Sequence, residues 1–445
     1  MRRLAFVLLP MSLNLLTAQE ARNSKVEHLV SQVSPARLRD TVTHLVGFGT
    51  RHTLSDTTSE TRGIGAARRW LTAEFTALTQ SSNSRLKSYE DRFTAEPGPR
   101  LPQAVELVNV GVVLPGTDPS RTKDAIVLTG HYDSRASDPM DAKSGAPGAV
   151  DDGSGTAMML ELARMMAAEK PAISIYFVAV AGEEQGLVGS THFAKRLKAE
   201  GINVLAMVSV DIAGNTEGQD GVRDNVSARL FSEGVPALET DAQKRLREAL
   251  GGENDGSARE WARYVKRVGE RYVENLDLWL MLRRDRIARG SDHTSFSREG
   301  YPAIRLSEAH EHYDRQHQDV RNLDGRSYGD DLAHFDAAYA AKLGGALMAS
   351  AWHLAHAPAP PKDLVLGGAV SPDTKMRWTL ADPRTVGLIL YRRRADSLVW
   401  QRTQRFDKAT QLILKDVVPD NQVFALATVD SEGRESLPAY PSKLE

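Results

Sequence analysis

The chain of 445 residues contains no cysteine. This absence excludes disulfide bonds, thiolate metal ligands and a cysteine nucleophile, so any metal ion must be bound by imidazole or carboxylate groups. An excess of one charge is also missing, because 56 Lys and Arg residues stand against 58 Asp and Glu residues and give a net charge of −2. Such a near-neutral chain gives no reason to expect nucleic acid or an anionic membrane surface as a partner.

Long apolar runs are absent after the N-terminus, where Arg2 and Arg3 precede an apolar stretch at 4–16. That stretch is too short to span a bilayer comfortably, and it is followed by Thr17 and Ala18, small residues suited to cleavage. We therefore predict a signal peptide at residues 1–18, a periplasmic or secreted location, and no stable membrane insertion once the signal is removed. An uncleaved N-terminal anchor is the alternative interpretation.

Apolar runs of strand length alternate with helical patterns along most of the chain. The runs lie at 105–114, 125–129, 173–181, 204–210 and 302–306. Apolar residues at helical spacing lie at 34–79 (broken by the glycine-containing loop GFGTRHT at 47–53), 156–168, 190–197 and 335–356. Strands buried on both faces that alternate with helices predict an α/β fold with a mostly parallel mixed sheet flanked by helices.

Two segments depart from this alternation. Residues 216–282 are polar, charged and helix-prone, and we expect a helical insertion there within a main domain at 24–356. The proline-rich sequence APAPP at 357–361 is typical of a linker. Short alternating runs separated by turn residues follow it, and they predict a small all-β sandwich at 362–445.

Histidine and carboxylate residues follow directly after three of the predicted strands. They are His131 and Asp133, then Glu183 and Glu184, then Asp211, while Asp151 and Asp152 lie in a glycine-flanked loop between the first two strands. Each pattern alone is common: a His-x-Asp pair can be a surface hydrogen bond, adjacent glutamates a solvated helix face, and Asp-Asp-Gly a turn. Because ligands bind at the carboxyl ends of strands in open α/β sheets, the combination predicts one shared site.

Coordination chemistry explains why these residue types belong together. Zinc without thiolate takes imidazole nitrogen and carboxylate oxygen, and a catalytic zinc site leaves one position for water. A carboxylate with two oxygens can bridge two ions about 3.5–4 Å apart. A second carboxylate that does not bind metal can then accept a proton from the water. Neighbouring glutamates can supply both functions.

Together with Ser291-Asp292-His293, these motifs resemble those of the M28 family of co-catalytic zinc aminopeptidases, over about residues 105–322. The resemblance implies a zinc-exopeptidase-like fold, two Zn²⁺ ions per chain, and peptide substrates with a free N-terminal amine. The helical segment before residue 105 is similar to the N-terminal part of bacterial secreted members. Residues 362–445 are similar to a fibronectin type III module, which is a looser match.

The resemblance also implies roles for single residues. Asp151 would bridge both zinc ions and be joined to Asp152 by a cis peptide bond, a strained geometry that persists only where a site requires it. His131 and Asp211 would complete one zinc site, and Glu184 and a late histidine the other. Glu183 would be the general base and Asp133 would orient His131. Asp292 and His293 would line the substrate pocket.

The late histidine has three candidates in the segment EAHEHYDRQHQ, namely His310, His312 and His317. The resemblance places it in a loop after the strand at 302–306 and before an aspartate, which favours His317, with His312 next. Several members of the family have a tyrosine near this ligand for the oxyanion. Here Gln316 precedes the favoured histidine, and Tyr313 is the remaining candidate.

The sequence leaves rival functions open. A carboxypeptidase or a glutaminyl cyclase-like enzyme could use the same fold, and a cyclase would need only one metal ion. A non-catalytic binding protein would have lost ligands or the base, whereas every position is filled here. The C-terminal region could carry the main function, but Trp378 and Trp400 are expected in its core. The ligand types also allow cobalt or manganese, and the sequence indicates no oligomeric state.

Overall fold

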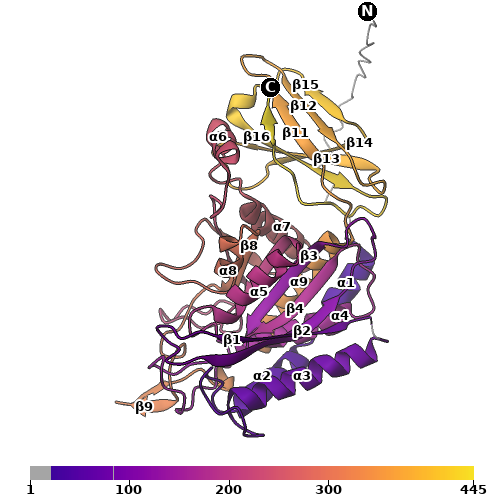
Figure 1. The fold of residues 1–445 in the computed structure, drawn as a ribbon. Coiled ribbons are helices and arrows are strands. Elements are labelled where there is room, and N and C mark those ends of the chain that lie inside the picture. Colours follow the sequence, from indigo (N-terminus) through magenta and orange to yellow (C-terminus); the bar gives the residue numbers. More distant parts are fainter. Residues whose placement is uncertain (1–21, 84) are drawn as a thin grey trace, which may run out of the picture.

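The computed structural model describes residues 22–83 and 85–445, so the predicted signal peptide lies outside the described residues. A mixed sheet forms the centre of the larger domain, with strand order β1-β2-β4-β3-β5-β8-β6-β7 (Figure 1). Its strands are β1 (Lys87–Ala95), β2 (Val105–Leu114), β3 (Asp124–His131), β4 (Ser174–Val180), β5 (Asn203–Val210), β6 (Ser227–Ser232), β7 (Asp277–Met281) and β8 (Ala303–Glu308). The four neighbours β4, β3, β5 and β8 are parallel, which confirms the predicted α/β class.

Helices cover both faces of this sheet. One face carries α1 (Ser24–Ser31), α2 (Pro35–Gly47), α3 (Gly63–Ser81), α4 (Gly153–Met166), α7 (Ser257–Tyr272) and α9 (Ala337–His356), which share the largest apolar core with the strands. The other face carries α5 (Val188–Ala199) and α8 (His293–Arg298). Phe193 of α5 and Phe296 of α8 pack there against Val127 and Met207 of the sheet.

Local sequence explains where these helices begin. Ser34 caps α2 by accepting a hydrogen bond from the Arg37 N–H, and Pro35 occupies the first helical position, where no donor is needed. Asp336 caps α9 in the same way, and most of that helix is buried because it is apolar on nearly all sides. The predicted helical stretch at 34–79 is two helices, since Gly49 (φ +74°) and Gly63 (φ +82°) turn the chain between them.

The segment at 216–282 differs from the expected helical insertion. It contains α6 (Asp241–Leu250) and α7, but also β6 and β7, which extend the central sheet. β6 runs antiparallel to β8 and is only six residues long, so its apolar pattern is weak in the sequence. A small hairpin of β9 (Arg321–Leu323) and β10 (Arg326–Tyr328) follows β8 and projects from the body of the domain (Figure 1).

The C-terminal region is an all-β sandwich, as its alternating runs predicted. One sheet has the order β15-β12-β11-β17 and the other β14-β13-β16. The strands are β11 (Lys362–Gly367), β12 (Thr374–Thr379), β13 (Gly387–Arg394), β14 (Arg402–Asp407), β15 (Gln411–Leu414), β16 (Gln422–Val429) and β17 (Lys443–Leu444). Trp378 of the first sheet packs with Leu388 and Phe424 of the second. Its likeness to a fibronectin type III module stays a prediction.

The sandwich lies directly on α7 (Figure 1), and the contact between them is polar and buried. The Glu260 carboxylate of α7 accepts hydrogen bonds from the Tyr440 hydroxyl at 2.6 Å and from Trp400 Nε1 at 3.0 Å. Arg263 donates to the Leu398 carbonyl at 2.7 Å. Trp400 therefore lies at the interface between the two parts, where it also packs on Tyr440.

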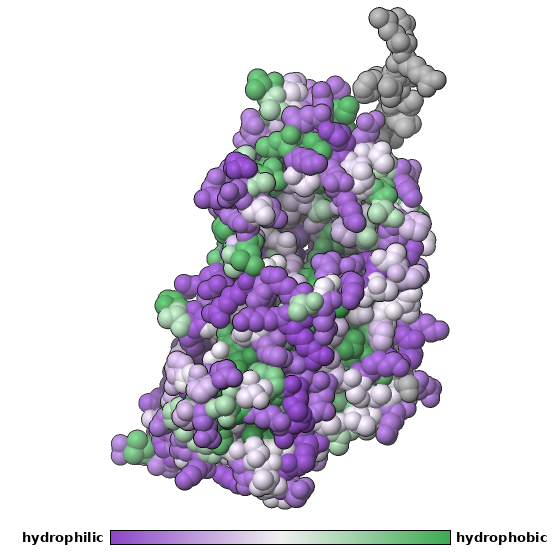
Figure 2. Space-filling view, in the orientation of Figure 1, coloured by the Kyte–Doolittle hydropathy of each residue, from purple (hydrophilic) through white to green (hydrophobic). Residues whose placement is uncertain are grey.

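The proline-rich connection at 357–361 is held by both parts. The Ala357 carbonyl accepts hydrogen bonds from Arg121 of the larger domain and from Arg384 of the sandwich. Figure 2 shows mainly hydrophilic residues on one face of the molecule, with apolar residues in small separate groups. Within the part of the chain that the structure describes, no helix has the length and apolar character needed to cross a membrane.

Candidate metal centre

The predicted ligands meet at the carboxyl edge of the parallel strands. His131 ends β3, the pair Glu183-Glu184 follows β4, and Asp211 follows β5. Asp151 lies in the loop before α4, and the late histidine in this cluster is His317, in the loop after β8. The structure thus brings together side chains that are up to 186 positions apart in the sequence.

Asp151 stands between the two histidines of the cluster. Its Oδ1 lies 3.2 Å from His131 Nε2, and its Oδ2 lies 3.1 Å from His317 Nε2. His317 Nε2 is also 3.2 Å from Glu184 Oε1, and His131 Nε2 is 3.8 Å from Asp211 Oδ1. One carboxylate therefore directs a separate oxygen toward each of two histidine–carboxylate pairs.

Two groups of side chains have the spacing of a metal site. The first is His131, Glu183 and Asp211, and the second is Asp151, Glu184 and His317; within each group the potential ligand atoms lie within 4.8 Å of one another. Nitrogen and oxygen ligands in this number suit zinc, which takes imidazole and carboxylate where no thiolate is present. Asp151 Oδ1 lies close enough to His131 to join the first group as well.

Two of the potential ligand atoms lack hydrogen-bond partners in the part of the chain that the structure describes, and a bound cation would satisfy them. Asp151 Oδ2 and Glu184 Oε1 are buried and form no hydrogen bond among the described residues, although His317 lies close to both. Burial disfavours the protonated form of His131, yet the carboxylates around it raise its pKa well above the usual value. So many buried carboxylates need positive charge among them, and a bound metal ion would supply it.

Asp152 is the cap of the neighbouring helix. Its Oδ1 accepts a hydrogen bond from the Gly155 N–H at 2.8 Å, and its Oδ2 accepts one from the His131 N–H at 3.0 Å. The peptide bond between Asp151 and Asp152 is cis, as the resemblance implied. This arrangement links the strand end that carries His131 to the loop that carries Asp151.

Asp133 has more contacts than the expected one with His131. Its carboxylate lies 3.6 Å from His131 Nδ1, while its own carbonyl lies nearer to that nitrogen, at 3.1 Å. The carboxylate oxygens accept hydrogen bonds from the backbone N–H groups of Glu183 at 3.2 Å and Glu184 at 3.1 Å. Asp133 therefore fixes the turn that carries both glutamates as well as the ring of His131.

Glu183 belongs to the first group by distance, and it has the electrostatic surroundings of a proton acceptor. Burial raises its pKa well above the ordinary range, and the neighbouring carboxylates of Glu184, Asp211 and Asp292 raise it further against the opposing effect of His131. A carboxylate whose pKa is raised takes up a proton more readily near neutral pH.

Two buried residues that the sequence did not single out support the Asp151 loop. The Asp330 carboxylate accepts hydrogen bonds from the Asp151 N–H at 2.7 Å and from the Val150 N–H at 2.9 Å. The Arg51 guanidinium, from the loop GFGTRHT, donates to the carbonyls of Tyr132 at 2.7 Å and Gly148 at 2.9 Å. Arg51 thus joins the strand end of His131 to the loop of Asp151, and burial lowers its pKa to about 10.

A third missed residue is Arg305, a fully buried arginine within β8. Its Nη2 lies 3.2 Å from Asp211 Oδ1, and its Nη1 lies 3.1 Å from Asp285 Oδ1. A charged residue inside an otherwise apolar strand was the available signal for it. Arg305 limits how Asp211 can turn, and its guanidinium contacts the same oxygen of Asp211 that faces His131.

The remaining predicted residues lie around this cluster with different contacts. His293 is buried, and its Nε2 lies 2.8 Å from the Arg284 carbonyl. Both carboxylate oxygens of Asp292 are buried without a hydrogen bond among the described residues, and burial raises its pKa to about 7. Tyr313 is 57% exposed. His310 pairs with Asp220 instead of joining the cluster.

Comparison with known proteins agrees with these motifs. Residues 109–334 match the family model described as Peptidase family M28. A protein of Leptosphaeria maculans named "Probable zinc metalloprotease" is 38% identical over 95% of this chain and 97% of its own length. The chain belongs to peptidase family M28. A second relative of this M28 chain, from Pyricularia oryzae and of the same printed name, is 37% identical over 94% of the chain and 84% of its own length.

Solved structures support the fold of this M28 chain. The LapA aminopeptidase of Legionella pneumophila is 19% identical, covers 79% of this chain and 80% of its own, and gives a TM-score of 0.52. An aminopeptidase from Aneurinibacillus is 14% identical, covers 74% of this chain and 96% of its own, and gives a TM-score of 0.50. At this level of identity the comparison supports the zinc-exopeptidase-like fold alone.

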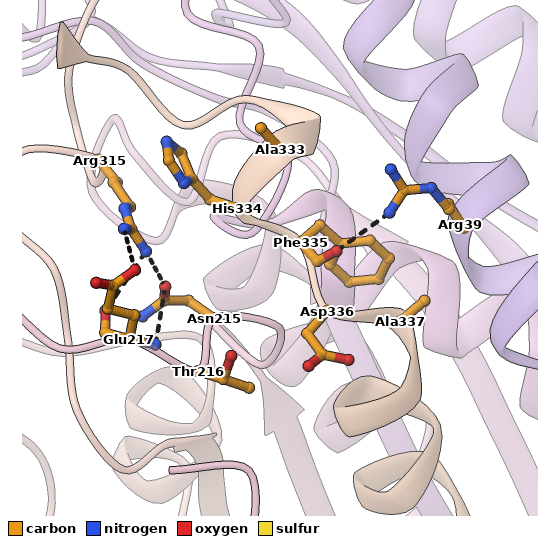
Figure 3. Close-up of a pocket in the computed structure, with 10 residues that line it drawn as sticks. All are labelled: Arg39, Asn215, Thr216, Glu217, Arg315, Ala333, His334, Phe335, Asp336 and Ala337. Carbon is orange, nitrogen blue, oxygen red and sulfur yellow. Dashed lines mark hydrogen bonds and ion pairs between the residues drawn. The ribbon is translucent and has the colours of Figure 1, made fainter. Parts of the chain in front are cut away.

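A separate polar hollow of about 380 Å³ opens between the loop after β5 and the start of α9 (Figure 3). Its lining includes Arg39, Asn215, Glu217, Arg315 and His334. Arg315 bonds to Asn215 and to Glu217, with Nη2 3.1 Å from Glu217 Oε2. None of its lining residues is one of the predicted ligands of this M28 chain, so the hollow is distinct from the metal centre.

Proposed function

We propose that the chain is an exported zinc aminopeptidase that binds two zinc ions and removes N-terminal residues from peptides. The observation that carries this proposal is the position of Asp151, whose two oxygens lie 3.2 Å from His131 Nε2 and 3.1 Å from His317 Nε2. A carboxylate so placed suits a bridge between two ions. The printed names of the curated relatives, which are zinc metalloproteases, support zinc as the metal.

Each proposed ligand set combines imidazole with carboxylate. Asp151 with His131 and Asp211 would hold one zinc ion, and Asp151 with Glu184 and His317 would hold the other. His131 keeps its Nε2 for the metal because its Nδ1 is directed at the Asp133 carbonyl. Zinc, when bound, polarises the scissile carbonyl and lowers the pKa of a water molecule.

Glu183 performs the proton transfers of hydrolysis. Its carboxylate accepts the proton that the attacking water releases, and it then gives that proton to the nitrogen of the leaving amine. The Asp133 carboxylate holds Glu183 in place by accepting a hydrogen bond from the Glu183 backbone N–H. The tetrahedral intermediate collapses with cleavage of the carbon–nitrogen bond, so one water is consumed for each peptide bond.

The charge of the site favours substrates with a free amine. Asp133, Asp151, Glu183, Glu184 and Asp211 all lie within or beside the cluster, and with two zinc ions bound they would still exceed the metal charge by one and attract an ammonium group. Two of the solved structures with this fold are named aminopeptidases. Export to the periplasm or the medium rests on the basic and apolar sequence at residues 1–18.

The test combines metal analysis with a change at Glu183. Wild-type protein should contain two zinc ions per chain and hydrolyse aminoacyl-nitroanilides, and a chelator should abolish the activity. Glu183→Gln should keep the zinc and lose about 10²–10⁴-fold in kcat, because the variant cannot accept the proton. Glu184→Gln is the matched control, since it should lose zinc as well as activity.

Several outcomes would contradict the proposal. Wild-type rates in Glu183→Gln would contradict the assignment of Glu183 as the general base. A content of one zinc ion per chain would contradict the assignment of Asp151 as a ligand shared by two ions. Peptides with a blocked N-terminus separate the alternatives, because a carboxypeptidase cleaves them and an aminopeptidase does not.

A further inference from the structure

The loop between β7 and α8 places an arginine beside the metal centre. The side chain of Arg289 is 30% exposed, and its Nη1 lies 3.1 Å from Glu311 Oε2. Glu311 is the only hydrogen-bond or ion-pair partner of this side chain among the described residues. The remaining N–H groups of this guanidinium are therefore free to bind a ligand, while Glu311 fixes its position.

Glu311 does not neutralise Arg289, because three arginines share its carboxylate. Arg229 lies 2.6 Å from Oε1, and Arg286 lies 2.9 Å from Oε2, the oxygen that Arg289 also contacts. The Glu311 side chain is only 2% exposed, so it cannot turn toward one arginine alone without repacking. Arg286 also pairs with Asp285, so three arginines stand against two carboxylates, and one positive charge is in excess at this edge.

A continuous series of ion pairs connects this edge to the metal centre. It runs from Asp211 through Arg305, Asp285, Arg286 and Glu311 to Arg289. Asp151 and Asp211 also act directly on Arg289, because both contribute to raising its pKa against the effect of burial. Arg289 thus lies within electrostatic range of two of the carboxylates that we assign to zinc.

We propose that Arg289 binds a carboxylate of the substrate, and that the preferred substrates are short peptides whose free carboxylate lies close to the scissile bond. This inference rests on the proposed peptidase function. The carboxylate charge that exceeds the metal charge attracts the amine of such a peptide, and a cation beside the cluster can hold its free carboxylate. A planar guanidinium can do so with two parallel hydrogen bonds.

The test compares peptides that differ only at the C-terminus. For the wild type, Leu-Gly-Gly should have a KM at least ten-fold lower than Leu-Gly-Gly-amide. Arg289→Gln should raise the KM of the free acid to that of the amide and leave kcat on the amide within two-fold. A second pair, Leu-Glu-amide and Leu-Gln-amide, tells whether a side-chain carboxylate is accepted in place of the terminal one.

Two variants and a binding assay separate recognition from a structural role. Arg283→Gln is the matched control, because Arg283 lies exposed in the same loop and its side chain makes no ion pair among the described residues. Arg289→Lys should restore part of the preference for the free acid. In the Glu183→Gln background, calorimetry should give a ten-fold weaker Kd for Leu-Gly-Gly when Arg289→Gln is added, and no change for the amide.

Equal losses of kcat on the acid and on the amide would overturn the proposal, since Arg289 would then act on the reacting carbonyl or on the fold. Equal affinity of the wild type for acid and amide would overturn it too. Failure of the aminopeptidase proposal is distinguishable, because cleavage of N-acetylated peptides alone would contradict that function while the acid–amide comparison would still report on Arg289.

Discussion

Replacing Gly130 with alanine is expected to move a metal ligand without touching it. Gly130 precedes His131 in β3 and lies against the first turn of α4. A Cβ at this position would be 2.4 Å from the Gly155 carbonyl carbon and 2.6 Å from the Thr156 nitrogen. Both are backbone atoms, and ordinary contact begins at 3.4 Å, so strand and helix must separate by about 1 Å.

The size of the effect follows from that displacement. Overpacking of a buried contact costs about 1–3 kcal/mol in the free energy of unfolding. A misplacement of about 1 Å in a catalytic group costs about 10²-fold in rate. Because Asp152 and Asp151 lie at the start of α4 and His131 ends β3, the shift falls directly on the distance between His131 Nε2 and Asp151 Oδ1. The two effects should therefore be of similar size, because 10²-fold in rate corresponds to about 2.7 kcal/mol.

Urea unfolding, zinc content and kcat/KM on an aminoacyl-nitroanilide measure these effects. Gly47→Ala is the control, because a Cβ there meets no atom within 4 Å. Wild-type stability and kcat/KM in Gly130→Ala, or equal impairment of Gly47→Ala, would refute the expected displacement of His131.

Two other predictions concern buried groups that do not bind the metal. Asp330→Ala removes the acceptor for the backbone N–H of Asp151 and should weaken zinc binding about 10–100-fold. Chelator competition measures this affinity, and an unchanged value would show that the Asp151 loop keeps its conformation without Asp330. Burial lowers the pKa of His353 to about 4. The unfolded chain, with a pKa near 6.5, therefore takes up the proton first as pH falls, and about 2–3 kcal/mol of stability should be lost between pH 7.5 and 4.5. His353→Gln should reduce that loss in urea unfolding, and an unchanged pH dependence would contradict the assignment.

The sequence was sufficient for the parts of the site that lie at strand ends. His131, Glu184 and Asp211 each follow an apolar run, so their meeting at one edge could be expected from the parallel sheet alone. The choice of His317 over His312 came from the family resemblance, and the structure places His317 beside Asp151. The roles of these residues in catalysis stay proposals.

The supporting residues could not be predicted in the same way. Arg51 and Asp330 act through backbone carbonyls and N–H groups, which carry no sequence signature. Three of the six residues of β6 are polar or charged and the strand lies within a charged stretch, so its pairing with β8 depends on the sheet already being present. Tertiary contacts, and not local pattern, decide such elements.

The buried polar contact between α7 and the sandwich has a consequence for how the protein can be divided. Glu260 is enclosed by Trp400 and Tyr440, and burial raises its pKa even with these partners present. Separating the sandwich would leave that carboxylate and Arg263 facing each other without the neighbours that complete their hydrogen bonds. Residues 24–356 without the sandwich would expose polar groups that are now paired across this interface, so the chain of 445 residues is the form in which the enzyme is best prepared and compared with its relatives.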